Sequence, residues 1–299
     1  SGLELIRFNK DYGCYLANEV NNFISKNNIN KNEIDLISSH GHTIFHQPKQ
    51  GFTYQIGCGI EISTKTNIKT VCDFRSLDLA HGGQGAPLVP IGDLHLFNKY
   101  EYCLNLGGIA NISFENKNQR VAGDIDFANI NSNNLGKKLG FSMDENGRLA
   151  NQGKLNEDLI KELKENKFYE LSFPKSLAIE DYYNWYLPIL NKYNISIYDQ
   201  LHTTGLLLCE NIKKVIAFNK KHQLLITGGG AYNSFWINNL KKIGVNVVLP
   251  DDQTIQFKEA IIFAFLGVLH LKKEVNTLAS VTGATKNLKS GILYDPKNF

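Results

Sequence analysis

The chain has 299 residues, of which 42% are hydrophobic and 20% are charged, and its formal net charge is +3. This composition is ordinary for a globular enzyme, the near-neutral charge argues against a nucleic-acid-binding face, and the length predicts two lobes. The five cysteines include no Cys-x-x-Cys pair, so we expect free thiols in a reducing cytoplasm rather than disulfides or a zinc site. No apolar run reaches membrane-spanning length and no signal peptide is visible, so no membrane partner is expected.

The predicted elements begin with an amphipathic helix over residues 3–26. The residues expected on its apolar side are Leu5, Ile6, Tyr15, Leu16, Val20, Phe23 and Ile24. Strands are then expected at 34–39, 52–56, 69–74, 102–106, 110–115, 223–227 and 245–249. Further helices are expected at 61–66, 88–97, 130–139, 155–165, 181–190, 199–218, 234–243 and 258–271.

This alternation of strands and helices predicts an α/β protein. We place the lobe boundary near residues 97–102, which gives a first lobe of residues 1–98 and a second lobe of residues 99–299. A return of the C-terminal segment to the first lobe is left open. Because an α/β domain usually opens with a strand, we expect either that Ser1-Gly2 is a cloning remnant or that an upstream piece is absent.

Two glycine turns each follow an apolar strand. The first contains Asn105, Gly107 and Gly108, and the second contains Gly228, Gly229, Gly230 and Asn233. Glycine lets a phosphate approach bare backbone N–H groups, so the pair suggests a bound nucleotide, although each could be a simple tight turn. Neither matches a dinucleotide-binding G-x-G-x-x-G pattern or a G-x-x-x-x-G-K-[ST] loop.

Two carboxylates stand at a strand end just before a predicted helix. Asp124 and Asp126 are spaced so that either could act as a general base, ligate Mg²⁺ or cap the helix, and the sequence does not choose between them.

Two polar segments of the first lobe are further candidates. His40 follows a strand directly, where α/β folds place ligands. Arg75 can clamp a carboxylate or sugar hydroxyls, or pair with Asp73 to support a turn. Asp78 and Gln84 lie in the glycine-rich stretch that follows.

The order of these motifs resembles the anhydro-N-acetylmuramic acid kinases over essentially the whole chain. The most distinctive match is Gly82-Gly83-Gln84-Gly85-Ala86-Pro87-Leu88-Val89-Pro90. Other matches are Ser39-His40-Gly41-His42-Thr43, Asp73-Phe74-Arg75, Asn105-Leu106-Gly107-Gly108-Ile109-Ala110-Asn111, Pro174-Lys175-Ser176, Gly228-Gly229-Gly230-Ala231-Tyr232-Asn233, Glu259-Ala260 and Thr282-Gly283-Ala284. The resemblance implies a two-lobed, ribonuclease H-like fold of the actin, hexokinase and Hsp70 superfamily. It also implies a cytoplasmic enzyme that opens 1,6-anhydro-N-acetylmuramic acid and phosphorylates O6 with MgATP in cell-wall recycling.

The resemblance also assigns residue roles. It makes Asp124 the catalytic aspartate, which would deprotonate a water that attacks C1 while the released O6 takes the γ-phosphoryl group. The turn of Asn105, Gly107 and Gly108 becomes the second phosphate loop, and Gly228, Gly229, Gly230 and Asn233 seat the adenosine. The sugar contacts would be His40, Arg75, Asp78 and Gln84. ATP and Mg²⁺ are the implied cofactors, with no metal ligand assigned in the protein, and a homodimer is left open.

The sequence departs from the family pattern at two places. The Ser-Gly-Thr-Ser-x-Asp-Gly loop with which the family opens is not found, so we expect a first lobe truncated at its N-terminus. The Asp-Thr-Gly-Pro-Gly-Asn stretch reads Asp124-Ile125-Asp126-Phe127-Ala128-Asn129. The alternatives are a non-catalytic sugar-binding relative, a catalytically impaired fragment, and an actin-like or Hsp70-like ATPase acting on a protein, against which residues 82–90 argue.

Overall fold

The computed structural model describes residues 1–216 and 222–298 and divides into two compact units. Unit 1 comprises Ser1–Gly92 and Glu259–Phe299, and unit 2 comprises Asp93–Lys258. The chain passes between them inside two helices, α4 (Pro90–Leu96) and α11 (Asp252–Leu271). The boundary expected after residue 98 therefore falls at Gly92, and the segment from Glu259 onward belongs with the first unit.

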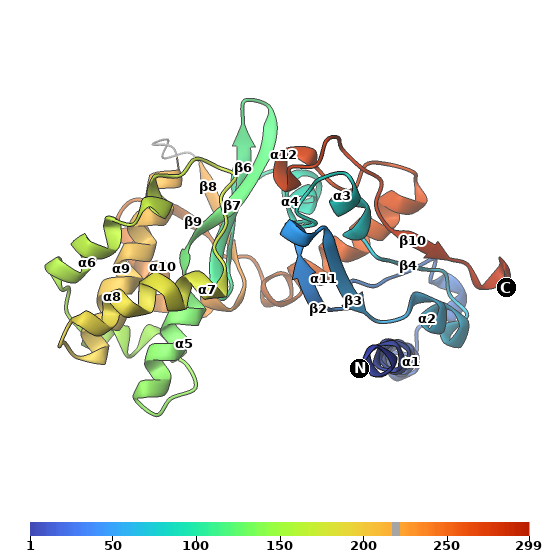
Figure 1. The fold of residues 1–299 in the computed structure, drawn as a ribbon, viewed down its shortest axis with the longest axis horizontal. Helices are drawn as coiled ribbons and strands as arrows, with labels where there is room; N and C mark the ends of the chain where they lie inside the picture. Colours follow the sequence, from blue (N-terminus) through green and yellow to red (C-terminus); the bar gives the residue numbers. More distant parts are fainter. Residues whose placement is uncertain (217–221, 299) are drawn as a thin grey trace. The chain divides into compact units, whose positions relative to one another are not determined.

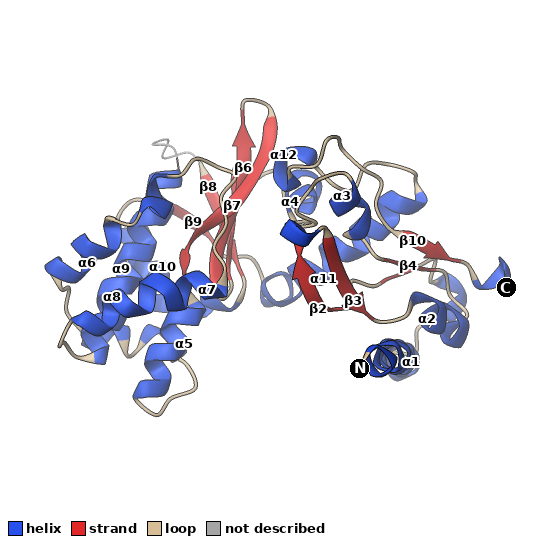
Figure 2. Cartoon of the chain, in the orientation of Figure 1, coloured by secondary structure: helices blue, strands red, loops and turns tan. Residues whose placement is uncertain are grey.

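Unit 1 contains two small sheets (Figures 1 and 2). In one, β4 lies between β1, which is parallel to it, and β10, which is antiparallel, while β2 and β3 form a separate antiparallel pair. The strands are β1 (Ile37–Ser38), β2 (His42–Gln47), β3 (Phe52–Ile56), β4 (Thr70–Cys72) and β10 (Ile292–Tyr294). The helices are α1 (Gly2–Lys26), α2 (Gly59–Thr66), α3 (Ser76–Ala80) and α12 (Ala279–Thr282), with parts of α4 and α11.

Helix α1 forms as predicted, and its buried side matches the expected one in part. Ile24 is buried and Leu5, Leu16 and Val20 are half-buried, whereas Ile6, Tyr15 and Phe23 are exposed. It begins at a capping box in which Ser1 and Glu4 bond each other's backbone N–H groups. The residues it buries are Gly13, Ala17 and Ile24, whereas Ile6 is 67% exposed and Phe23 62% exposed. Small residues let a helix backbone approach its neighbours closely, so the side of α1 that packs against the rest of unit 1 is centred on Gly13 and Ala17.

Helix α11 is long and apolar. Within the described residues it is the one helix whose length and composition would allow it to cross a membrane, so the expectation that no segment reaches this length does not hold for α11. Ile262 and Leu266 are fully buried, and 39% of the apolar window of α11 is buried. A core helix passes the same length and composition test.

Unit 2 is built on a five-stranded sheet with the order β7-β6-β5-β8-β9. Strand β5 pairs antiparallel with β6 and parallel with β8, β6 pairs antiparallel with β7, and β8 pairs parallel with β9. The strands are β5 (Tyr102–Leu106), β6 (Ile109–Asn116), β7 (Gln119–Phe127), β8 (Gln223–Thr227) and β9 (Asn246–Val248). In chain order this arrangement is 3-2-1-4-5 with the second strand reversed, which is the ribonuclease H-like order.

The helices of unit 2 largely follow the predictions. They are α5 (Asn129–Lys138), α6 (Glu157–Lys164), α7 (Ile179–Asp181), α8 (Leu187–Lys192), α9 (Ile197–Val215) and α10 (Ser234–Lys242). Residues 217 and 218 of the helix expected at 199–218 lie outside the described residues. The helix expected at 181–190 is divided into α7, a π-helical turn and α8.

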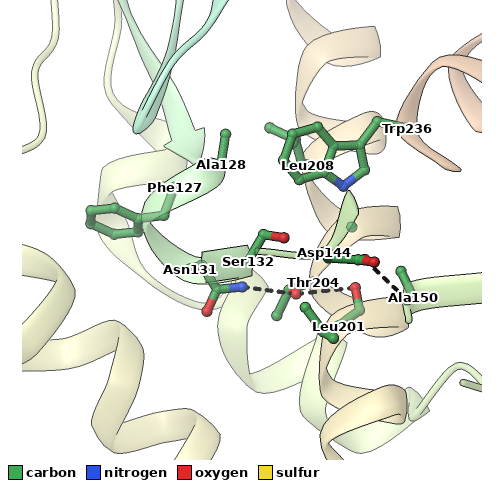
Figure 3. A pocket seen from close by; sticks show the side chains of 11 residues that line it. Phe127, Ala128, Asn131, Ser132, Asp144, Ala150, Leu201, Thr204, Leu208 and Trp236 are labelled. Carbon is green, nitrogen blue, oxygen red and sulfur yellow. Dashed lines mark hydrogen bonds between the residues drawn. The ribbon is translucent and has the colours of Figure 1, made fainter. Parts of the chain in front are cut away.

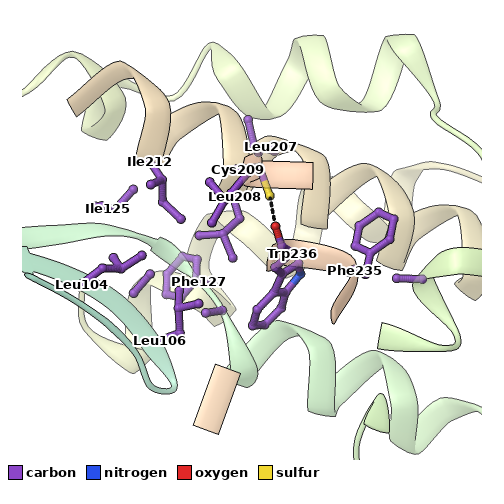
Figure 4. Close-up of a cluster of buried hydrophobic side chains, with 14 of the residues drawn as sticks. Leu104, Leu106, Ile125, Phe127, Leu207, Leu208, Cys209, Ile212, Phe235 and Trp236 are labelled. Atoms are coloured by element: carbon purple, nitrogen blue, oxygen red, sulfur yellow. Dashed lines mark hydrogen bonds between the residues drawn. The ribbon is translucent and has the colours of Figure 1, made fainter. Parts of the chain in front are cut away.

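The core of unit 2 lies between the sheet and helices α9 and α10 (Figure 4). Leu104 and Leu106 point from β5 into this core, and Ile125 and Phe127 do so from β7. They meet a large set of buried side chains from the helices, including Leu207, Leu208, Ile212, Phe235 and Trp236. This packing fixes the strand ends on which the candidate residues lie.

A buried charge cluster joins the two ends of unit 2. The Lys258 Nζ lies 2.6 Å from Asp93 Oδ1, and Ser113 donates its hydroxyl to Asp93 Oδ2. The Arg120 Nη2 donates to Ser113 Oγ at 2.8 Å and lies 4.0 Å from Asp93 Oδ2. The side chains of Asp93, Arg120 and Lys258 are at most 7% exposed. Charges at this depth persist because they are paired.

Candidate active site

Four polar residues form a lateral row across the sheet of unit 2. Thr227 on β8 lies opposite Asn105 on β5, Asn105 lies opposite Asn111 on β6, and Asn111 lies opposite Asp124 on β7. Directly opposite residues of neighbouring strands share a face of the sheet, so the four side chains form one polar band. Asn111 ends one of the motifs that match the family, but its sequence position does not show that it lies between Asn105 and Asp124, and nothing local marks Thr227.

The two glycine turns lie beside one another at the end of this row. Gly228 has a φ of +80°, and a Cβ there would lie 2.5 Å from Asn105 Oδ1. A Cβ on Gly230 would lie 2.5 Å from the Leu106 Cβ. The second turn therefore packs directly against the end of β5, which only glycine at these positions permits.

The turn of Gly107 and Gly108 rests on the start of helix α5. The Gly107 carbonyl accepts from the Asn129 N–H at 3.1 Å, and the Gly108 carbonyl accepts from the N–H groups of Ala128 and Ile130 at 3.0 Å. These bonds occupy the donors at the α5 N-terminus. Asn233, at the end of the second turn, caps α10 by accepting from the Trp236 N–H.

A β-bulge separates the two carboxylates of β7. Asp124 pairs with Asn111 and Asp126 pairs with Ala110, with an irregularity between them. Since Ala110 and Asn111 are consecutive, they face opposite sides of the sheet, and so do their partners. Asp124 therefore belongs to the polar band, whereas Asp126 faces the core side.

The burial of Asp126 suits a structural role. It is fully buried and accepts from the Tyr169 hydroxyl at 2.9 Å, the Asn211 amide at 2.9 Å and the Phe127 N–H at 2.8 Å. Burial raises its pKa to about 7, against the opposing effect of these donors. The structure thus distinguishes two residues that the sequence left equivalent.

Asp124 is only partly buried, and one of its carboxylate oxygens accepts a hydrogen bond from the backbone. The Leu177 N–H donates to Asp124 Oδ2 at 2.8 Å. Desolvation raises the pKa of Asp124 to about 6, while the Leu177 bond and the nearby Lys175 charge lower it. A carboxylate with a pKa near neutrality is suited to accept a proton from water or a hydroxyl.

In unit 1, Arg75 and His40 bind each other. The Arg75 Nε donates to His40 Nε2 at 2.9 Å, and the Arg75 Nη1 donates to the Gly85 carbonyl at 2.6 Å. A histidine that accepts at Nε2 carries its proton at Nδ1, which lies 3.1 Å from the Gly41 carbonyl. Burial and the Arg75 charge lower the pKa of His40 to about 4, so this imidazole is neutral.

The buried side chain of Asp78 is hydrogen-bonded to the glycine-rich loop of residues 82–85. It is fully buried, and its oxygens accept from the Gly85 N–H and the Thr282 hydroxyl, each at 2.7 Å. Gln84 is exposed, and its N–H donates to the Thr282 carbonyl. The structure thus gives Asp78 internal bonds, while Gln84 keeps an accessible side chain, and the sugar contacts expected of both residues stay predictions.

A small cavity in unit 2 is not part of the polar band (Figure 3). It lies between α5, α9 and Trp236, and its volume of about 10 Å³ leaves room for about one water molecule. Asn131 donates to the Thr204 hydroxyl beside it.

Within residues 1–216 and 222–298 there is no group of three or more His, Cys, Asp and Glu side chains that could hold a metal ion.

The sheet order and the glycine turns beside a polar band place the protein among the ATP-dependent phosphotransferases with the actin-like ATPase fold. Residues 3–296 match the family model described as anhydro-N-acetylmuramic acid kinase. The chain belongs to the anhydro-N-acetylmuramic acid kinase family.

Curated relatives agree with this assignment. The chain is 33% identical over 298 residues to the anhydro-N-acetylmuramic acid kinase of Vibrio parahaemolyticus, covering 94% of this chain and 80% of that one. It is 33% identical over 328 residues to that of Clostridioides difficile, covering 100% and 84%. It is 34% identical over 318 residues to that of Francisella tularensis subsp. novicida, covering 99% and 82%. Among solved structures, the activator of 2-hydroxyisocaproyl-CoA dehydratase from Clostridium difficile with bound ADPNP matches with a TM-score of 0.36 and 16% identity, covering 63% of this chain and 68% of that one.

Proposed function

We propose that this kinase converts 1,6-anhydro-N-acetylmuramic acid to N-acetylmuramic acid 6-phosphate in the cytoplasm, with Asp124 as the general base. The supporting observation is the position of Asp124 in the polar band that ends at the two glycine turns. Asp124 accepts a proton from a water whose oxygen bonds to C1 of the sugar. The C1–O6 bond breaks, and O6 forms a bond to the γ-phosphorus of ATP as ADP leaves. Most of the catalysis then comes from alignment and charge stabilisation.

The direct test incubates the purified chain with the anhydro sugar and MgATP. We expect a product whose mass equals the substrate plus one water and one phosphoryl group, detected by mass spectrometry and ³¹P NMR. Sugar binding by calorimetry without such a product would support the non-catalytic alternative. The expected absence of the family's first phosphate loop stays a prediction, because the family model matches from residue 3 onward. The homodimer likewise stays a prediction.

The sugar contacts are proposed on the same basis. Arg75 and His40, which are already hydrogen-bonded to each other, would contact the sugar together. Gln84 would contact it through its exposed side-chain amide. Asp78 would act indirectly by fixing the loop that carries Gln84.

Replacing Gly228 with alanine is expected to weaken ATP binding about tenfold, because the added Cβ displaces Asn105 and the positive φ disfavours alanine by about 1–3 kcal/mol. Calorimetric titration with a non-hydrolysable ATP analogue measures the change. Gly229→Ala is the matched control, since its Cβ would meet only the Asn129 Nδ2, at 3.8 Å. Equal losses in both variants would contradict the role given to the Gly228 backbone.

A further inference from the structure

Residues 173–177, here called the strap, run along the outer edge of β7 beside Asp124. The Asp124 N–H donates to the Lys175 carbonyl at 2.8 Å, and the Leu177 N–H donates back to Asp124 Oδ2 at 2.8 Å. The strap therefore forms hydrogen bonds with both the backbone and the side chain of Asp124. Among the described residues, no protein group donates to the other carboxylate oxygen, Oδ1.

Gly123 allows the strap to approach this closely. A Cβ at position 123 would lie 2.7 Å from the Lys175 carbonyl oxygen and 2.7 Å from the Phe173 ring. Any other residue here would push the strap away from β7. The strap is further fixed by the Phe173 ring, which packs edge-on against Phe114 at a centroid distance of 5.2 Å.

Lys175 brings a positive charge to this part of β7. Its Nζ donates to the Phe168 carbonyl at 3.2 Å and lies 4.4 Å from the centre of the Phe168 ring. The charged and titratable groups that interact with it are Asp124 and Asp126 on β7 and Lys214 on α9. Tyr169, from the turn that precedes the strap, bonds Asp126 rather than Asp124. The Lys175 charge therefore lowers the pKa of Asp124, although it forms no ion pair with that carboxylate within 4.0 Å and its effect is smaller than that of the Leu177 bond.

We infer that the strap is the positioning element of the catalytic base. The Leu177 N–H fixes one carboxylate oxygen so that the other receives the proton, and the strap that carries this N–H also brings the Lys175 charge to the same part of β7. This inference rests on the proposed role of Asp124, and it assigns a function to the Pro174-Lys175-Ser176 motif. Lys175 and Leu177 are positioning residues, because they act through Asp124.

The test compares Lys175→Met with Lys175→Arg in the full chain by measuring kcat/KM against pH. An acid must be ionised to act as a base, so activity rises with pH through the pKa of Asp124. Losing an opposite charge raises the pKa of a carboxylate, so we expect the acidic limb of the Lys175→Met profile to move to higher pH. Lys175→Arg keeps the charge and should return the limb toward the wild-type position. A merely structural role would lower activity at every pH and leave the limb in place, which would overturn the inference.

Gly123→Ala tests the strap without changing any charge. We expect kcat to fall about 100-fold, as for a misplacement of a catalytic group by about 1 Å, with the KM for ATP little changed. A wild-type kcat in this variant would contradict the inference. If Asp124→Asn is inactive while the Lys175→Met limb does not move, only the strap inference fails. If Asp124→Asn remains fully active, the proposed function itself fails.

Discussion

Asp124→Asn is expected to lower kcat by about 10³-fold, within the range that a general base contributes. Asparagine has nearly the same shape and can still accept the Leu177 N–H through its carbonyl oxygen, so the strap contact survives. What the variant loses is the ability to take a proton from water. The rate of ADP release in the presence of the anhydro sugar measures the change, and calorimetry should show that the affinity for ATP stays within about threefold of wild type.

Asp126→Asn provides the matched control for this variant. It makes the same chemical change two residues along β7, but on the other side of the bulge, where Tyr169 and Asn211 bind the carboxylate. We expect its main effect to be on stability, with a kcat far above that of Asp124→Asn. If Asp126→Asn lost more activity than Asp124→Asn, the two carboxylates would have to exchange roles.

Lys258→Met is expected to destabilise unit 2 by about 3 kcal/mol, because it leaves the buried Asp93 carboxylate without its closest cation. Ser113 still bonds that carboxylate and Arg120 lies 4.0 Å away, so the loss should fall at the lower end for a broken buried pair. Urea unfolding followed by tryptophan fluorescence reports on unit 2, since Trp185 and Trp236 both lie there. A change below about 1 kcal/mol would mean that the pair resembles an exposed ion pair in its energetics.

The double variant Asp93→Asn with Lys258→Met separates the pair from its surroundings. If the cost of Lys258→Met comes from an uncompensated carboxylate, neutralising Asp93 should recover a large part of it. Additive losses in the double variant would instead show that the two residues act independently.

The sequence predicts well those parts of unit 2 that depend on local pattern. The strands next to the glycine turns were expected within about one residue, because apolar runs and glycines mark them directly. The bulge was not expected, since nothing local shows that Ile125 is the extra residue of β7. The residues alone therefore did not show that Asp124 and Asp126 face opposite sides of the sheet, and the prediction of Asp124 as the catalytic residue rested on the family resemblance.

Unit 1 was harder to predict. Strand β2 (His42–Gln47) was not among the expected strands, because four of its six residues are polar and its pairing with β3 leaves most of its side chains exposed. The contact between Arg75 and His40 joins residues far apart in sequence and has no local signature. The bonds that Asp78 makes to the Gly85 N–H and the Thr282 hydroxyl could not be predicted either, because Thr282 lies about two hundred residues further along the chain.

The ion pair between Asp93 and Lys258 has a consequence for how the protein is assembled. Unit 2 is one continuous stretch of chain, and unit 1 supplies the sequence on both sides of it. Its first and last residues are in contact, so unit 2 begins and ends at one point, as an inserted domain does. Residues 93–258 therefore have the geometry of an inserted domain. Such a segment could be replaced by that of a relative while the two flanking segments of unit 1 keep their positions.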